Sequence, residues 1–141
     1  MALNRELGVD VEHMRYLADA DQIADNFFSL YERKMLRSLL PENVRTEAFF
    51  CCWTRKEAYV KALGNGLSQP LDQFDVTLLP GEEAELLAVQ GKPEEMQRWR
   101  LHNVVLPPVY ARHYKAALVV ESSAANTDSL IELWQWQAEG E

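Results

Sequence analysis

The segment from Trp53 to Gly64 places the strongest constraint on the fold, because its composition predicts a helix with an unusual polar face. Ala, Leu, Lys and Glu favour helix formation, and a Gly commonly ends a helix. At roughly 100° per residue, Trp53, Lys56, Glu57 and Lys61 fall within an arc of about 140°. One face of this helix therefore combines a carboxylate, two ammonium groups and an indole. Such a face is suited to hold a cation together with a polyanionic ligand.

The rest of the chain predicts one strand, then helices, then several strands. The residues from Ser29 to Glu32 form a capping box, which starts a helix. The expected helices cover about 21–28 and 30–40, and a third begins between 41 and 46 and ends at 64. The expected strands cover 6–12, 73–79, 84–89, 99–106 and 113–120. The pattern at 130–136 fits a strand or a helical turn. This order predicts an α+β fold with helices packed on an antiparallel sheet, in one domain that covers residues 1–141.

The composition is typical of a globular domain and argues against two classes of function. Apolar residues make up 48% of the chain, which is enough for a packed core. The net charge of −8 argues against general nucleic-acid binding. No run of 18 apolar residues is present, so no membrane span is expected. The start of the chain has no apolar signal region, so we expect a cytoplasmic protein.

The charge is unevenly distributed along the chain. Residues 1–64 contain 9 Lys or Arg against 10 Asp or Glu, whereas residues 65–141 contain 5 against 12. The near-neutral first part is therefore the part suited to receive an anionic ligand. The two cysteines, Cys51 and Cys52, are neighbours on a predicted helix and point in different directions. We expect them to be reduced thiols that pack as small apolar residues.

Asp10 and Glu12 are candidate metal ligands on the first predicted strand. They lie two residues apart, so both point to the side of Gly8, with Cα atoms roughly 6.7 Å apart. Carboxylates this close repel each other unless a cation or solvent intervenes, and Mg²⁺ prefers oxygen ligands of this kind. Gly8 leaves room on that side for a ligand or for neighbouring backbone. The alternative, for two carboxylates spaced in this way, is a solvated strand face.

The polar residues of the helix at 53–64 also have simpler explanations when each is taken alone. Glu57 and Lys61 have the spacing of a favourable surface ion pair. Lys56 alone fits a solvated surface position, and Trp53 alone fits a core position. Gly64-Asn65-Gly66 fits a turn, or a loop that binds phosphate through its backbone N–H groups.

Taken together, these segments resemble the 4′-phosphopantetheinyl transferase superfamily. The resemblance lies in residues 8–12 (GVDVE), 27–32 (FFSLYE) and 53–64 (WTRKEAYVKALG). Residues 66–71 (GLSQPL) are similar to the larger class typified by the surfactin synthetase activator. Weaker similarity continues at Trp99, Leu101 and 116–118. The resemblance implies a 4′-phosphopantetheinyl transferase-like single half, similar to the second half of that larger class.

The resemblance also implies an activity and a set of roles. Such enzymes move the phosphopantetheine arm of coenzyme A onto a serine of an acyl or peptidyl carrier protein. By analogy, Asp10, Glu12 and Glu57 would bind Mg²⁺, and Lys56 and Lys61 would face the phosphates of coenzyme A. Lys61, a carboxylate or a metal-bound water would remove the serine proton. A lysine beside phosphate is normally protonated, so we rank Lys61 first as a phosphate and leaving-group stabiliser. Trp53 would support the site.

The larger class has a first half that carries a Ser-His element and basic residues around the nucleotide, and no matching segment precedes residue 6. We expect one of two arrangements. In the first, the chain forms a homo-oligomer, a dimer or trimer, in which a second copy closes the site. In the second, the chain is a truncated half that is weakly active or inactive and acts as a subunit or binding module. Arg33, Lys34 and Arg37 could receive an acidic carrier, or form a solvated helix face.

Overall fold

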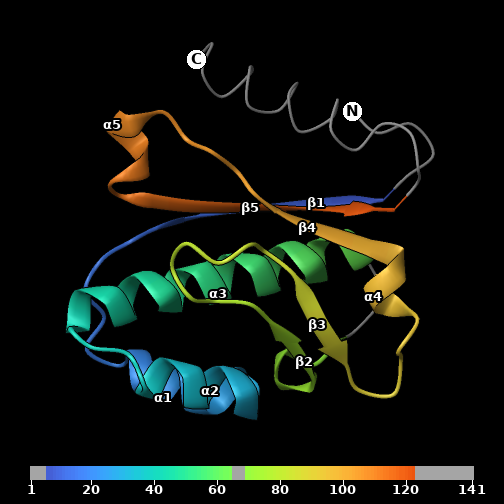
Figure 1. Cartoon of the computed structure of the whole chain (residues 1–141), viewed down its shortest axis with the longest axis horizontal. Helices are drawn as coiled ribbons and strands as arrows, with labels where there is room; N and C mark the ends of the chain where they lie inside the picture. Colours follow the sequence, from blue (N-terminus) through green and yellow to red (C-terminus); the bar gives the residue numbers. More distant parts are fainter. Residues whose placement is uncertain (1–5, 65–68, 123–141) are drawn as a thin grey trace.

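A three-stranded antiparallel sheet forms one layer of the fold, and the long helix α3 lies across one of its faces (Figure 1). The computed structural model describes residues 6–64 and 69–122. The helices are α1 (Ala20–Phe27), α2 (Leu30–Arg37), α3 (Glu42–Leu63), the 3₁₀ turn η1 (Leu71–Gln73), α4 (Glu95–Arg98) and α5 (Pro108–Ala111). The strands are β1 (Leu7–His13), β2 (Phe74–Val76), β3 (Leu86–Val89), β4 (Trp99–Asn103) and β5 (Tyr114–Glu121).

The sheet confirms the predicted α+β architecture. Its strand order is β1-β5-β4, with both pairs antiparallel, so β5 lies in the centre and β1 and β4 form the edges. The strands β2 and β3 form a separate antiparallel pair. Helices α1 and α2 lie on the side of α3 that faces away from the sheet (Figure 1). No helix in the described ranges is long and apolar enough to cross a membrane.

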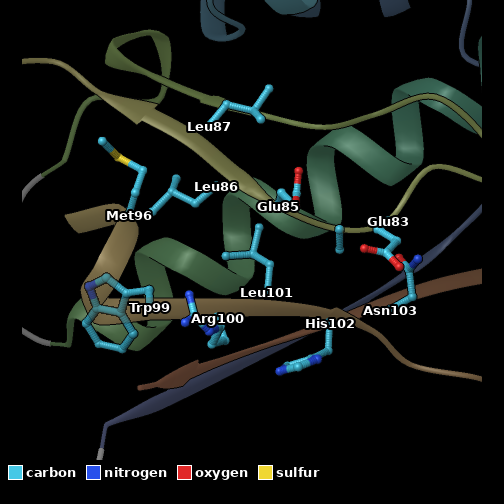
Figure 2. Close-up of a pocket in the computed structure, with 11 residues that line it drawn as sticks. Glu83, Glu85, Leu86, Leu87, Met96, Trp99, Arg100, Leu101, His102 and Asn103 are labelled. Atoms are coloured by element: carbon cyan, nitrogen blue, oxygen red, sulfur yellow. The ribbon is translucent and has the colours of Figure 1, made fainter. Parts of the chain in front are cut away.

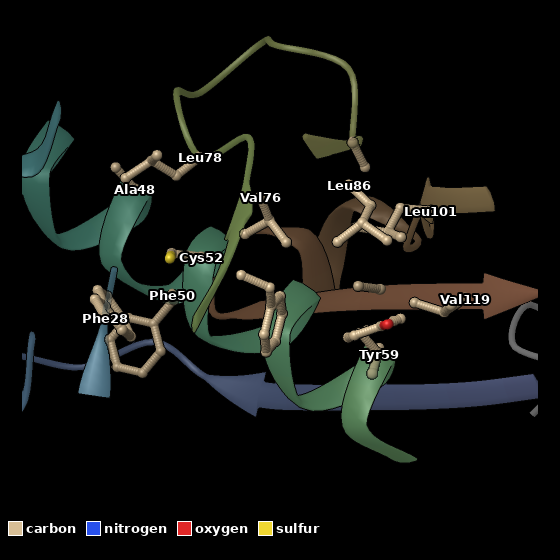
Figure 3. Packing of buried hydrophobic residues seen from close by; sticks show 14 of the residues in the cluster. Phe28, Ala48, Phe50, Cys52, Tyr59, Val76, Leu78, Leu86, Leu101 and Val119 are labelled. Carbon is tan, nitrogen blue, oxygen red and sulfur yellow. The ribbon is translucent and has the colours of Figure 1, made fainter. Parts of the chain in front are cut away.

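Helix α3 forms the centre of the core because other elements cover most of its circumference. The sheet packs against Ala58 and Ala62, while Tyr59 contacts Phe74 and Trp99 from the β2 and β4 strands. Figure 3 shows Cys52 and Tyr59 of α3 among the buried side chains of the other elements. Cys51 and Cys52 are free and buried, as the sequence predicts, and burial raises the pKa of both thiols.

Several element boundaries differ from the sequence predictions. Helix α2 ends at Arg37 rather than near Leu40, because the N–H groups of Ser38 and Leu39 bond to carbonyls in a tighter turn. Strand β2 ends at Val76 because its pairing with β3 shifts register between Asp75 and Val76. The short helices α4 and α5 are not evident in the sequence pattern. The segment at 130–136 and the loop residues Asn65 and Gly66 lie outside the described ranges.

Candidate functional site

The candidate site lies where the edge strand β1 crosses α3, and Gly8 sets how closely the two approach. A Cβ atom on Gly8 would lie 2.2 Å from the Ala58 carbonyl oxygen and 2.4 Å from the Ala62 amide nitrogen. Only glycine therefore permits this contact between backbones. Since Asp10 and Glu12 lie on the same side of β1 as Gly8, the contact brings their carboxylates toward the polar face of α3.

Asp10, Glu12, Glu57 and Lys61 come together at this crossing. Asp10 is 4% exposed, and its Oδ1 atom accepts a hydrogen bond from the Lys61 ammonium at 2.7 Å. Lys61 itself keeps 53% of its side chain exposed, so the ammonium stands at the solvent edge of the site. Glu12 and Glu57 are half-buried and close enough to Asp10 for their charges to interact. Their proximity was expected from the sequence only through the family resemblance.

Burial and neighbouring charges raise the pKa values of Glu12, Glu57 and Lys61 at this crossing. Burial, then a hydrogen bond and repulsion from Asp10, raises the pKa of Glu12 from 4.5 to about 7. Burial and repulsion from Asp10 also raise the pKa of Glu57. The hydrogen bond to Asp10, with the attraction of the ammonium to the Asp10, Glu57 and Glu12 carboxylates, raises the pKa of Lys61. The site therefore has an excess of negative charge that one ammonium group does not balance, and Lys61 is held protonated.

The donor set fits a hard divalent cation. Asp10 Oδ2 is buried, and no described residue donates a hydrogen bond to it when all the carboxylates are ionised. If Glu12 is protonated, its carboxyl group can donate a hydrogen bond to Asp10. A cation could satisfy the same oxygen, and carboxylate oxygens are the ligands that Mg²⁺ prefers. Within residues 6–64 and 69–122, no three acidic, His or Cys side chains already stand in metal-binding geometry. Binding would therefore require the half-buried Glu12 and Glu57 side chains to turn toward Asp10.

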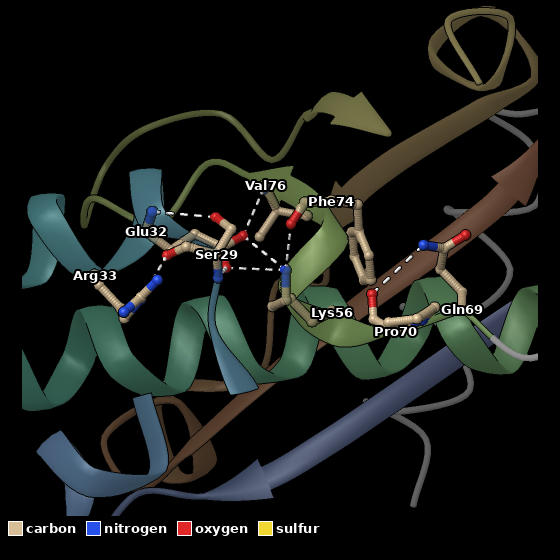
Figure 4. A network of polar contacts seen from close by, with 8 residues as sticks. All are labelled: Ser29, Glu32, Arg33, Lys56, Gln69, Pro70, Phe74 and Val76. Carbon is tan, nitrogen blue, oxygen red and sulfur yellow. Dashed lines mark hydrogen bonds and ion pairs between the residues drawn. The ribbon is translucent and has the colours of Figure 1, made fainter. Parts of the chain in front are cut away.

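Lys56 does not lie at this site, which corrects the expectation that it faces the same ligand as Lys61. Its side chain is 1% exposed and lies 2.9 Å from the Glu32 carboxylate of α2. Its ammonium also donates to the Phe74 carbonyl and lies 3.7 Å from the centroid of the Phe74 ring (Figure 4). The four residues lie on α3 as predicted, but α2 and β2 pack over the edge of the helix face that carries Lys56. Lys56 therefore joins three elements instead of meeting solvent.

Glu32 has a second role that the sequence did not reveal. Its Oε1 atom accepts from the Ser29 N–H, which completes the predicted capping box. Its Oε2 atom accepts from Lys56 and from the Val76 N–H. The capping box was the available signal, but the partners of the remaining oxygen lie 24 and 44 residues away.

Trp53 lies one helical turn before Glu57, and its ring belongs to an aromatic cluster. It stacks on Phe49 at 6.3 Å and meets Phe27 edge-on at 6.3 Å. Phe28 contacts both Phe49 and Trp53. Trp53 therefore links α3 to α1, and it lies on the face of α3 that carries Glu57.

Known proteins match this chain over most of its length. Residues 6–119 match the 4′-phosphopantetheinyl transferase superfamily. The 4′-phosphopantetheinyl transferase HetI of Nostoc sp. is 40% identical over 82 residues, which cover 58% of this chain and 34% of HetI. A 4′-phosphopantetheinyl transferase of Bacillus pumilus is 38% identical over 117 residues, which cover 82% of this chain and 48% of that protein. The chain thus spans about a third to a half of the length of these curated relatives.

Solved structures share the fold. The holo-[acyl-carrier-protein] synthase of Thermotoga maritima has a TM-score of 0.61 at 19% identity, covering 84% of this chain and 63% of that one. The Bacillus anthracis synthase, solved in complex with CoA (3′,5′-ADP), has a TM-score of 0.60 at 20% identity and covers 84% of this chain and 96% of that one. At these identities the likeness concerns the fold alone. From the sequence match and the shared fold together, the chain belongs to the 4′-phosphopantetheinyl transferase superfamily.

Proposed function

We propose that this chain takes part in the Mg²⁺-dependent transfer of the 4′-phosphopantetheine arm of coenzyme A to a serine of an acyl or peptidyl carrier protein. The observation that carries the proposal is the convergence of three carboxylates and one ammonium group where β1 crosses α3. Phosphoryl transfer depends mainly on positioning and on stabilisation of charge, which such a cluster supplies. Family membership supports the same reaction.

Each residue of the cluster has a proposed role. Asp10, Glu12 and Glu57 would hold Mg²⁺, which would neutralise the pyrophosphate and the charge on the leaving group. Lys61 would turn its exposed ammonium from Asp10 Oδ1 to a phosphate oxygen when the cation arrives. Because Lys61 is held protonated, it is poorly suited to accept the serine proton. A carboxylate that does not hold the cation, or a metal-bound water, is the better candidate for that step.

Lys56 and Trp53 would act by positioning α3 rather than by touching coenzyme A. The buried pair of Lys56 with Glu32 fixes α3 against α2, and the stacking of Trp53 fixes it against α1. Both residues precede Glu57 in α3, Trp53 by one helical turn and Lys56 by one residue. They would hold its carboxylate in register with β1.

A second polypeptide surface would complete the site. On the face of the sheet opposite α3, Leu7 and Val11 of the edge strand β1 are 37% and 49% exposed, beside the buried Leu118 and Val120 of β5. A second copy of this chain, in a dimer or trimer, or a separate first half would cover such a face. A chain without that second surface would have weak activity or act only as a subunit.

Intact-mass spectrometry tests the proposed reaction. The protein would be incubated with coenzyme A, Mg²⁺ and a panel of apo acyl and peptidyl carrier proteins. Addition of phosphopantetheine to a carrier is expected with Mg²⁺ and not with EDTA. Light scattering on the same samples reports whether the active species contains more than one copy.

Glu57→Gln is the informative variant, and Glu47→Gln is its control on the same helix, because Glu47 pairs with Lys115 away from the cluster. The first is expected to abolish transfer and the second to leave it unchanged. Unmodified carriers across the whole panel, at a wild-type concentration that forms oligomers, would count against the enzymatic proposal.

A further inference from the structure

A cavity of about 630 Å³ lies between β3 and β4, at the edge of the sheet opposite β1 (Figure 2). Its volume is in the range of ligand pockets in proteins. Apolar side chains from both strands and from α4 form its floor, namely Leu86, Leu101, Trp99 and Met96. Charged and amide side chains line its rim, namely Glu83, Glu85, Arg100 and Asn103. None of these residues belongs to the cluster at the β1–α3 crossing.

The wall formed by β4 is a strand edge that pairs with nothing in the described ranges. Opposite residues of an antiparallel pair alternate between hydrogen-bonded and non-bonded positions. Ser122 donates to the Arg98 carbonyl and Val104 donates to the Ala116 carbonyl, so the even-numbered residues of β4 turn their backbone groups toward β5. The backbone groups of Leu101 and Asn103 therefore turn to the opposite side, where the cavity lies.

Among the residues that the structure describes, the outer side of β3 is also unpaired, and this strand is irregular. Asp75 pairs with Ala88 and Val76 pairs with Leu86, so Leu87 is an extra residue without a partner on β2. Such a bulge redirects the strand and often lies near a binding site. Leu87 is 38% exposed and is among the residues that line the cavity.

The rim carries opposite charges on its two walls. Glu83 and Glu85 lie on the β3 side, and Arg100 lies on β4. All three are exposed, and none forms an ion pair with another described residue. Figure 2 shows Arg100 between Trp99 and Leu101, and Glu83 toward Asn103. A bound segment would therefore meet a positive charge near one end of the cavity and negative charges near the other.

We propose that the free edge of β4 binds an extended segment of a partner polypeptide by strand addition. The segment would bond its backbone to the N–H and C=O groups of Leu101 and Asn103, as strand-adding peptides do at other sheet edges. Because side chains alternate along a strand, its apolar residues would cover Leu86 and Leu101, while a residue of the other face would meet Arg100. The complementary segment carries an acidic residue for Arg100 and a basic residue for Glu83 or Glu85.

Fluorescence anisotropy with a defined peptide tests this binding mode. The probe is a labelled, end-capped peptide with the core Glu-Val-Thr-Val-Lys, which alternates apolar and polar residues. Saturable binding to the full chain is expected. Two versions, N-methylated on alternate sets of residues, distinguish strand addition from burial of the valines. The set that faces β4 is expected to bind about tenfold more weakly, because two backbone hydrogen bonds are lost.

A charge exchange provides the matched control. Arg100→Glu is expected to weaken the probe about fivefold, and replacing the acidic residue of the probe by Lys is expected to restore binding. Arg112→Glu, at an exposed position beside α5, is expected to change nothing. Protection of the Leu101 amide from hydrogen exchange in the complex would place the peptide. No saturable binding, equal binding of both methylated versions, or no effect of Arg100→Glu would each overturn the proposal.

Discussion

The Glu32 carboxylate and the Lys56 ammonium lie 2.9 Å apart, with side chains that are 0% and 1% exposed. Each charged group is removed from water and depends on the other for compensation. The pair joins the second and third helices directly behind the candidate site. Loss of this ion pair should therefore lower the stability of the fold, and it should affect the reaction only through that loss of stability.

Lys56→Met is expected to lower the free energy of unfolding by about 3–5 kcal/mol, because it leaves a buried carboxylate without its cation. Urea denaturation measures this loss. The exposed Lys34, on α2, provides the control, and Lys34→Met is expected to change the free energy by less than about 0.5 kcal/mol. The double variant Glu32→Gln with Lys56→Met is expected to be less destabilised than the sum of its parts. Strict additivity would show that the pair is not coupled.

Gly8→Ala is expected to force β1 away from α3. The new methyl group would overlap the α3 backbone, which cannot move as a side chain would, and overpacking of this kind costs about 1–3 kcal/mol. The same shift separates Asp10 from Glu57, so the affinity for Mg²⁺ should fall as well. Thermal denaturation and calorimetry with Mg²⁺ measure the two effects. A variant with unchanged melting temperature and unchanged Mg²⁺ affinity would contradict the proposed role of this contact.

The metal-free protein is expected to lose stability as the pH rises through about 7. The pKa of Glu12 is 4.5 without perturbation and about 7 in the folded protein, so the folded state binds this proton more tightly than the unfolded state. The stabilisation is complete below pH 4.5 and is lost as the pH rises through about 7. Glu12→Gln should flatten this part of the melting profile. Mg²⁺ competes with the same proton, so its affinity should weaken below about pH 7. A pH-independent Mg²⁺ affinity between pH 5.5 and 8 would contradict this assignment.

Lys61 is expected to act through its charge. Lys61→Met should raise the KM for coenzyme A and lower kcat, whereas Lys61→Arg should keep part of both, because the positive charge remains. The pH–rate profile of the wild type should show no ionisation of Lys61 near neutrality, since its pKa is raised. Lys115→Met, which removes an ammonium paired with Glu47, is the control and should leave the kinetics unchanged. If Lys61→Arg is as inactive as Lys61→Met, charge alone does not explain the residue.

The local parts of the fold were predictable from the sequence. The capping box at Ser29 and the alternation around Asp10 depend on neighbours within a few residues, and both appear in the structure as expected. Gly64 also marked the end of α3 correctly, and the helix begins at Glu42, within the predicted interval of 41–46. In each case the determining interaction is short in sequence, so composition and spacing contain it.

The misplacement of Lys56 has a long-range cause. A helical wheel places Lys56 beside Glu57 and Lys61 but contains no information about which elements cover that edge of the helix. The packing of α2 and β2 decides this, through contacts with Glu32 and with the Phe74 carbonyl. The sequence was also insufficient for Gly8. The absence of a side chain predicted room for neighbouring backbone, but not that the backbone of α3 at Ala58 and Ala62 would occupy it. The set formed by Asp10, Glu12, Glu57 and Lys61 was anticipated by resemblance, not by spacing.

Titration calorimetry of coenzyme A measures whether the three carboxylates bind a divalent cation that recruits the pyrophosphate. Wild-type protein, Glu57→Gln and the control Glu47→Gln would each be titrated in Mg²⁺ and in EDTA. Wild type and the control are expected to bind coenzyme A at least about tenfold more tightly with Mg²⁺, and Glu57→Gln is expected to lose this dependence. Equal affinity of the wild type in Mg²⁺ and EDTA, or a Glu57→Gln variant that keeps the full Mg²⁺ effect, would contradict the proposed cation site.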